Sequence, residues 1–153
     1  FQEVASAIIA GDPLLDENAR APISAFGREA AKQAALEAQS DVLRDLSDEA
    51  GVFFFYRSDC PYCHAQAPVL EFLARETGFR VIAVAMDGLP LPGGEFPNYV
   101  VDRGQSEKLG VRGVPAMFLV RPPEDAIPIG QGLLPYTDVV ERMVNQAHAS
   151  GWI

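Results

Sequence analysis

The two cysteines of this 153-residue chain stand three positions apart, in the sequence CPYC at residues 60–63. A pair at this spacing can cycle between a dithiol and a disulfide, because one thiolate attacks a substrate sulfur and the other resolves the mixed disulfide. A single pair cannot supply the several cross-links that hold small secreted folds together. The motif therefore indicates local redox chemistry, with Cys60 as the nucleophile and Cys63 as the resolving cysteine.

The residues around the motif predict where each sulfur lies. An apolar run, Val52–Tyr56, reads as a buried strand, and the segment from Pro61 to about Glu76 has helical periodicity. The first amides of a helix have no partners and its dipole is positive there, so a thiolate at Cys60 is stabilised. Pro61 suits the first helical position. Cys63 follows one turn later, where we expect it to be more covered.

Three charged neighbours could tune this site. Asp59 directly precedes Cys60, and its negative charge opposes thiolate formation. Arg57 could offset that charge. His64 either lends positive charge to the site or is a solvated histidine on the helix face. Tyr62, between the cysteines, either lines a groove beside the sulfurs or packs as an ordinary aromatic residue.

Other uses of a CxxC pair have less support. Zinc usually takes four Cys or His ligands, and beyond the two cysteines the chain offers only His64 and His148. An iron–sulfur cluster shared between two chains and a pair of inert buried cysteines remain alternatives. The setting between a strand and a helix favours redox exchange, so we predict neither a metal nor another cofactor.

The composition excludes several classes of partner. With 48% hydrophobic residues the chain resembles soluble globular proteins, and 21 acidic against 12 basic residues give a net charge of −9. Such a charge repels phosphate backbones and anionic lipid, so nucleic acid is not an expected partner. No apolar stretch approaches the roughly 20 residues that span a bilayer, so we expect no direct membrane insertion. Because the sequence begins with Phe1 and not Met, we expect that a preceding segment, such as a signal peptide, has been removed.

Two regions differ in character. Residues 1–50 are rich in Ala and charge, and their periodicity predicts a helical arm of two or three helices, interrupted at Asp12-Pro13 and Ala21-Pro22. The arm either covers apolar surface of the following domain or binds a partner. We place the boundary near Gly51, so that residues 51–153 form the second domain.

The second region alternates strands and helices, which predicts an α/β fold. Residues 88–98, GLPLPGGEFPN, contain three Gly and three Pro and predict a loop, either a solvated insertion or a border of the active site. The expected strands are Val52–Tyr56, Arg80–Met86, Ala116–Val120 and Ile127–Gly130, and the expected helices are Pro61–Glu76, Ser106–Leu109 and Thr137–Ala149.

Three features together resemble thioredoxin-fold proteins: CPYC at a strand–helix junction, Pro68 five residues beyond the second cysteine, and the run EKLGVRGVPA at residues 107–116. The resemblance implies a central mixed sheet flanked by helices. It also implies that Pro115 is cis and packs against the active-site disulfide, and that Val114 offers main-chain hydrogen bonds to an extended substrate. Pro61 and Tyr62 would complete the substrate-binding surface. The plainer alternative is a trans Pro115 that opens a strand.

Further segments narrow the resemblance. They are FFFYRSDCPYC (53–63), VIAVAMDG (81–88), LPGGEFPN (91–98), LGVRGVPAMFLV (109–120) and IPIGQG (127–132). Over roughly residues 50–150 the chain resembles the TraF and TrbB group of conjugative-transfer proteins of Gram-negative bacteria. This resemblance implies a periplasmic thiol–disulfide oxidoreductase that forms or isomerises disulfides and assists assembly of a conjugative pilus and its type IV secretion apparatus. Its partners would be cysteine-containing protein substrates and other conjugation or secretion components.

Two departures keep other functions open. Thioredoxins usually carry a buried acid six residues before the first cysteine and a Trp directly before it, where this chain has Phe54 and Asp59. Some members of the transfer group lack the cysteines, so a non-enzymatic assembly or scaffold protein is one alternative. CPYC also occurs in glutaredoxins, so a glutaredoxin-like or thioredoxin-like reductase is another.

Overall fold

The computed structural model describes residues 16–123 and 125–153, so the predicted interruption at Asp12-Pro13 lies outside the described residues. The chain divides into two compact units, residues 1–38 and 39–153. The second unit holds the sheet, the cysteine motif and the C-terminal helix. The division at Gly51 stays a prediction.

The N-terminal helix α1 runs from Asp16 to Leu46. The predicted interruption at Ala21-Pro22 is wrong, because one continuous helix passes through this dipeptide. Proline removes one helical hydrogen bond, but residues 28–38 are mostly Ala, Glu, Gln, Lys and Leu, which are strong helix formers and continue the helix. In the last turns Leu43 and Leu46 are buried, so this end of the helix covers apolar surface, whereas binding of a partner by the arm stays an untested alternative.

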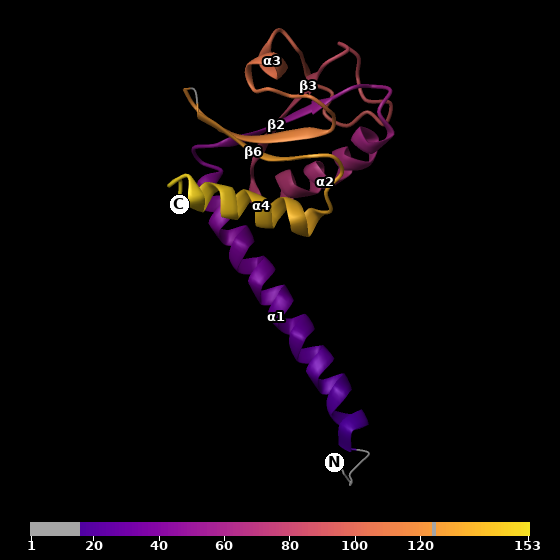
Figure 1. Ribbon diagram of the computed structural model, residues 1–153, viewed down its shortest axis with the longest axis vertical. Helices are drawn as coiled ribbons and strands as arrows, with labels where there is room; N and C mark the ends of the chain where they lie inside the picture. Colours follow the sequence, from indigo (N-terminus) through magenta and orange to yellow (C-terminus); the bar gives the residue numbers. More distant parts are fainter. Residues whose placement is uncertain (1–15, 124) are drawn as a thin grey trace. The chain divides into compact units, whose positions relative to one another are not determined.

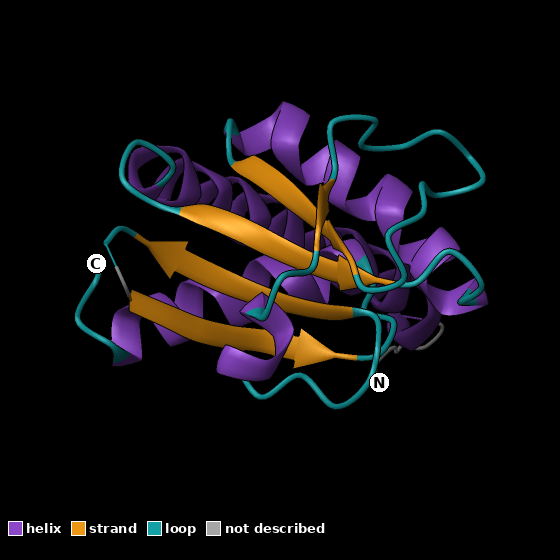
Figure 2. Ribbon diagram, turned by 90° about the horizontal axis from the view of Figure 1, so that it is seen from above, coloured by secondary structure: helices purple, strands orange, loops and turns teal. Residues whose placement is uncertain are grey.

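Five strands form one mixed sheet in the order β4-β3-β2-β5-β6 (Figure 2). The central strand β2 pairs in parallel with β3 and antiparallel with β5, and β4 and β6 are the edges. The strand β4 was not predicted, because two residues are too few for a pattern. The strands are β2 Gly51–Tyr56, β3 Arg80–Ala85, β4 Val100–Val101, β5 Ala116–Arg121 and β6 Asp125–Gln131.

Helices cover both faces of this sheet. Figure 1 shows α2 and α4 on one face and the short α3 on the other. All three were predicted, with ends that differ by at most one residue. The helices are α2 Pro61–Thr77, α3 Gln105–Lys108 and α4 Tyr136–Ala149. Gly78 ends α2 in the left-handed conformation, with a φ of 81° that favours glycine.

The central strand β2 is buried on both faces, as its apolar sequence predicted. Phe55 packs with Val84 and Phe118 in a cluster that Leu109 partly covers. Phe54 is also fully buried and points to the opposite face, because side chains alternate along a strand. Burial of such large rings on both sides anchors the strand whose end leads into the cysteine motif.

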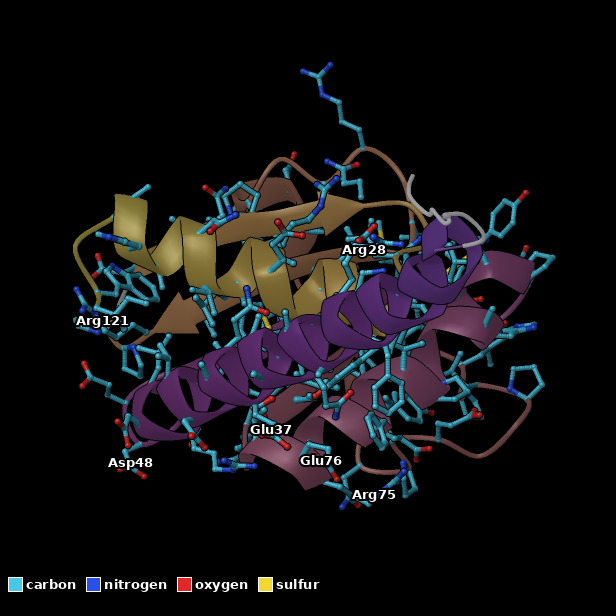
Figure 3. The ribbon with its side chains drawn as sticks, turned by 90° about the horizontal axis from the view of Figure 1, so that it is seen from below. Arg28, Glu37, Asp48, Arg75, Glu76 and Arg121 are labelled. Atoms are coloured by element: carbon cyan, nitrogen blue, oxygen red, sulfur yellow. A yellow bond between two sulfur atoms is a disulfide. The ribbon has the colours of Figure 1, made fainter. Side chains whose placement is uncertain are left out.

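The C-terminal residues pack back onto the second unit. The guanidinium of Arg121, labelled in Figure 3, lies 4.4 Å from the centre of the Trp152 ring. The same side chain donates to Asp125 at 3.2 Å. Within residues 16–123 and 125–153, no helix is both long and apolar enough to span a bilayer.

Candidate redox site

The two cysteines form a disulfide at the start of α2. Cys60 is the residue that caps the helix, with extended backbone angles, and Pro61 occupies the first turn as predicted. The Cys63 amide donates to the Cys60 sulfur at 3.1 Å. Cys63 is fully buried while Cys60 is half-buried, so only the first sulfur of the pair can be approached from solvent. This is the asymmetry that the position of the motif predicted.

The end of β2 places this helix start. Tyr56 is the last residue of the strand, and its carbonyl accepts the Met86 amide at 2.9 Å. A tight turn follows, in which the Cys60 amide donates to the Arg57 carbonyl at 3.3 Å. The buried strand, the short turn and the start of α2 therefore hold Cys60 just beyond the carboxyl end of the central strand.

The segment before β5 approaches the same sulfur. The Val114–Pro115 peptide bond is cis, as the resemblance implied. The Val114 carbonyl oxygen lies 3.8 Å from the Cys60 sulfur, a contact and not a hydrogen bond, because a disulfide sulfur carries no proton. The Pro115 carbonyl accepts the Gly132 amide at 2.7 Å, which ties this segment to the end of β6. Fifty-four residues apart in sequence, Cys60 and Val114 are thus brought together.

The predicted tuning residues Arg57 and Asp59 pair with each other. The Arg57 Nε lies 3.1 Å from the Asp59 carboxylate, and both side chains are about half exposed or more. An exposed pair of this kind stabilises a fold by only about 0–1 kcal/mol. Its more important effect is therefore on the charge next to the Cys60 sulfur. Tyr62 is 64% exposed, so it is a surface residue between the cysteines and not a core packing residue.

His64 is not a solvated histidine of the helix face, whereas its predicted positive charge at the site stays a prediction. Its Nε2 lies 2.6 Å from the Ser58 carbonyl oxygen, and its side chain is half-buried. Because a carbonyl only accepts, Nε2 carries the proton of this bond. The histidine therefore fastens the turn before Cys60 to the first turn of α2.

Sequence reasoning missed Ser58 and Asp87. One oxygen of the Asp87 carboxylate accepts the Ser58 amide at 2.9 Å and the Ser58 hydroxyl at 2.7 Å. Burial raises the pKa of Asp87, but the bonds from Ser58 and Leu89 and the charge of Arg57 outweigh it, so the pKa lies below its usual value. The available signal was position: Asp87 follows a predicted strand, and the carboxyl ends of parallel neighbouring strands meet at one edge.

The loop at residues 88–98 is exposed along most of its length, as a solvated insertion would be, but part of it is buried. Leu91 is 3% exposed, and the Phe96 ring meets Phe54 edge-on at 6.0 Å between ring centres. The Tyr56 hydroxyl donates to the Leu89 carbonyl at 2.8 Å. Part of the loop therefore belongs to the core, and Phe54, at the position where thioredoxins carry a buried acid, has apolar neighbours.

Gln66 is a second residue that sequence reasoning missed. It lies one turn beyond Cys63, is fully buried, and exchanges two hydrogen bonds with Leu134: its side-chain amide donates at 3.1 Å and its oxygen accepts at 2.8 Å. The sequence feature that could have revealed Gln66 is a polar residue on the apolar face of the predicted helix. It joins α2 to the segment before α4.

The described residues offer no alternative metal centre. Within residues 16–123 and 125–153, no three His, Cys, Asp or Glu side chains gather in a way that could hold a metal ion.

The mixed sheet, the flanking helices and the cysteine pair at the strand–helix junction define a thioredoxin-like α/β fold with a CXXC pair. Among solved structures, the chain is similar to the pneumococcal exposed lipoprotein thioredoxin Etrx1 of Streptococcus pneumoniae strain TIGR4. The TM-score is 0.51 and the identity 21%, over 67% of this chain and 89% of that one. At this identity the likeness supports the fold alone.

The chain belongs to the TraF family, the F plasmid transfer operon proteins, whose model matches residues 1–144. It is 32% identical to Protein TraF of Escherichia coli (strain K12) over 108 residues, which are 70% of this chain and 43% of that protein. It is 31% identical to Protein TrbB of the same strain over 105 residues, 60% of this chain and 56% of that protein. The chain thus spans about half the length of these relatives.

Proposed function

We propose that this protein is a periplasmic thiol–disulfide oxidoreductase that forms or isomerises disulfides in cysteine-containing components of a conjugative pilus and type IV secretion apparatus. One observation carries the proposal. The Cys60–Cys63 disulfide lies at the start of α2, where Cys60 is half-buried and Cys63 is fully buried, and the Cys63 amide donates to the Cys60 sulfur. Membership of a transfer-operon family supports the cellular setting.

In the oxidising direction, a substrate thiolate attacks the Cys60 sulfur and breaks the Cys60–Cys63 bond. Cys63 leaves as a thiolate and takes up a proton, and a mixed disulfide joins Cys60 to the substrate. A second substrate thiolate then attacks the substrate sulfur of this bond, which releases Cys60 as a thiolate. The substrate gains one disulfide and loses two electrons, and the protein becomes the dithiol. Isomerisation starts instead from the reduced protein: the Cys60 thiolate attacks a substrate disulfide and releases one substrate thiolate, which attacks another disulfide of the substrate. A substrate thiolate then displaces Cys60 from the mixed disulfide, so the pairing changes and no net electrons are transferred.

The chain positions both partners of the exchange. The Cys63 amide and the α2 dipole stabilise negative charge on Cys60 when it leaves. The Val114 backbone lies next to this sulfur and is free of the strand pairs of β5, so an extended polypeptide can pair with it. Exposed Pro61 and Tyr62 flank the point of attack. The substrate is accordingly an extended, cysteine-containing segment.

Trapping tests the catalytic order. In Cys63→Ser, a mixed disulfide formed at Cys60 cannot be resolved, so reduced variant mixed with an oxidised protein substrate accumulates a covalent adduct on non-reducing gels. The matched variant Cys60→Ser leaves only the buried sulfur and gives no adduct. Equal trapping by both variants would contradict the assigned order.

Complementation separates the enzyme from a scaffold. A strain lacking the native gene is supplied with wild-type protein or with Cys60→Ser, Cys63→Ser, and conjugative transfer is counted. We expect the double variant to lose transfer when substrates depend on disulfides. Full rescue would favour a non-enzymatic assembly role. Reduction of insulin and refolding of scrambled ribonuclease then distinguish a reductase from an isomerase.

A further inference from the structure

The turn that precedes the nucleophile is held from two sides. On one side, the Asp87 carboxylate accepts both the amide and the hydroxyl of Ser58. On the other, His64 bonds to the Ser58 carbonyl from the first turn of α2. Every polar group of Ser58 thus has a partner, although the residue lies in a short turn at the edge of the sheet.

The same carboxylate also holds the loop that follows β3. Its second oxygen accepts the Leu89 amide at 3.2 Å, and the Leu89 carbonyl in turn accepts the Tyr56 hydroxyl. One side chain therefore binds the turn 57–60 and the start of the loop 88–98. Charge-assisted bonds of this kind are stronger than neutral ones, so the two segments form one unit.

We propose that Asp87 is a positioning residue: its carboxylate locks the turn before Cys60 to the loop 88–98, and this lock keeps the Cys63 amide aimed at the Cys60 sulfur. The geometry, two bonds to Ser58 and one to Leu89, carries the assignment. It deepens the proposed function, because it names what prepares the nucleophile.

Two effects of Asp87 on Cys60 have opposite signs, which makes the proposal testable. If the carboxylate acted through its charge, its removal would favour the thiolate and speed alkylation. If it acts by positioning, its removal loosens the helix start, weakens the stabilisation of the thiolate by amides, and slows alkylation. The direction of the change therefore decides between charge and position.

The chain contains a matched control. Asp102 accepts the amide of Ser106 at 3.2 Å, also binds its hydroxyl, and accepts the Gly104 amide at 3.1 Å. It thereby holds the turn that leads into the short helix α3, which carries no cysteine. Asp102→Asn therefore removes the same kind of carboxylate from a comparable turn without touching the redox site.

The first experiment measures iodoacetamide alkylation of Cys60 in the Cys63→Ser background between pH 4 and 9, for Asp87→Asn, Ser58→Ala and Asp102→Asn. A tenfold loss of thiolate slows alkylation only about threefold, because a less acidic thiol gives a better nucleophile. We expect about threefold slowing below neutral pH for Asp87→Asn, a smaller slowing for Ser58→Ala, and no change for Asp102→Asn. Faster or unchanged alkylation in Asp87→Asn and Ser58→Ala would overturn the proposal.

Hydrogen exchange of the otherwise wild-type, oxidised protein supplies the second readout. Asp87→Asn should raise exchange in residues 57–60 and 88–98 together, whereas Asp102→Asn should raise it only around residues 103–109. Unchanged exchange in either Asp87-linked segment would also overturn the lock. Neither readout needs a substrate, so a protein without oxidoreductase activity would defeat the proposed function and leave this result standing. If Asp87→Asn does not fold, Ser58→Ala decides alone, because it retains every charge.

Discussion

The ion pair beside Cys60 combines Asp59, whose negative charge opposes formation of the Cys60 thiolate, with Arg57, whose positive charge offsets that effect. Asp59→Asn should speed alkylation of reduced Cys60 about twofold, and Arg57→Gln should slow it by a similar factor, because exposed charges act weakly through solvent. Their contact at 3.1 Å makes the two effects interdependent. The measurement is alkylation at low salt, repeated at high salt, where both effects should shrink. Changes of the same sign in the two variants would contradict this account.

Tyr56 should be visible in an alkaline titration. Burial, followed by the nearby Tyr99 and Asp87, raises the pKa of Tyr56 from 10.0 to about 12. Its contribution to stability is therefore complete below pH 10 and is lost as pH rises to about 12, because the unfolded chain ionises first. Absorbance at 295 nm should show a step near pH 12 that Tyr56→Phe removes. A wild-type titration that is complete well below that pH would refute the assignment.

At the scale of single residues, sequence reasoning found the groups whose type and spacing carry the chemistry. Cys60 and Cys63 are recognisable from their separation and from the strand before them. Ser58 and Asp87 are harder to recognise: each follows a predicted strand, but their contact also requires β2 and β3 to be parallel neighbours, which periodicity alone does not reveal. His64 was identified as a site residue, but its bond to a backbone carbonyl depends on a turn geometry that no local pattern specifies.

At the scale of elements, strong patterns predicted well and short ones did not. The sequence predicted β2 and α4 because a buried strand has a continuous apolar run and a half-buried helix has apolar residues at helical spacing. The two residues of β4 are too few to show such a pattern. The predicted interruption of α1 at Ala21-Pro22 is wrong because the strong helix formers after this proline continue the helix. The loop 88–98 was underestimated since its Gly and Pro content conceals the apolar Leu91 and Phe96.

Gln66 joins two elements, and its removal should be costly. In Gln66→Met the buried Leu134 amide and carbonyl lose their partners, and an unpaired buried group costs about 1–3 kcal/mol. We expect about 2–4 kcal/mol less stability by urea unfolding. The control is Gln146→Met, since Gln146 also bonds to a backbone carbonyl, that of Pro128, but at an exposed site that water can serve. Equal losses in the two variants would show that burial of the Gln66 bonds is unimportant.

At the scale of the whole molecule, the position of the domain boundary has an energetic consequence. The compact second unit begins at Gln39, twelve residues before the boundary predicted from sequence at Gly51. Composition changes at Gly51, but burial does not: Leu43 and Leu46 are 0% and 2% exposed, and the Arg44 side chain donates to the Glu76 carbonyl at 3.0 Å. The end of α1 is thus part of the core that supports α2.

Comparison of two truncated chains tests this boundary. Burial of a leucine side chain contributes about 1.5–3 kcal/mol, so residues 51–153 should be about 3–6 kcal/mol less stable than residues 39–153 in urea unfolding. In the longer chain, Leu43→Ala combined with Leu46→Ala should reproduce most of this loss, whereas Asp48→Ala, an exposed change nearby, should not. Because Gln66 and the Cys63 turn lie on the helix that this core supports, the shorter chain should also expose Cys63 to alkylation after reduction. Equal stability of the two chains would support the predicted boundary at Gly51 and assign the last turns of α1 to the arm.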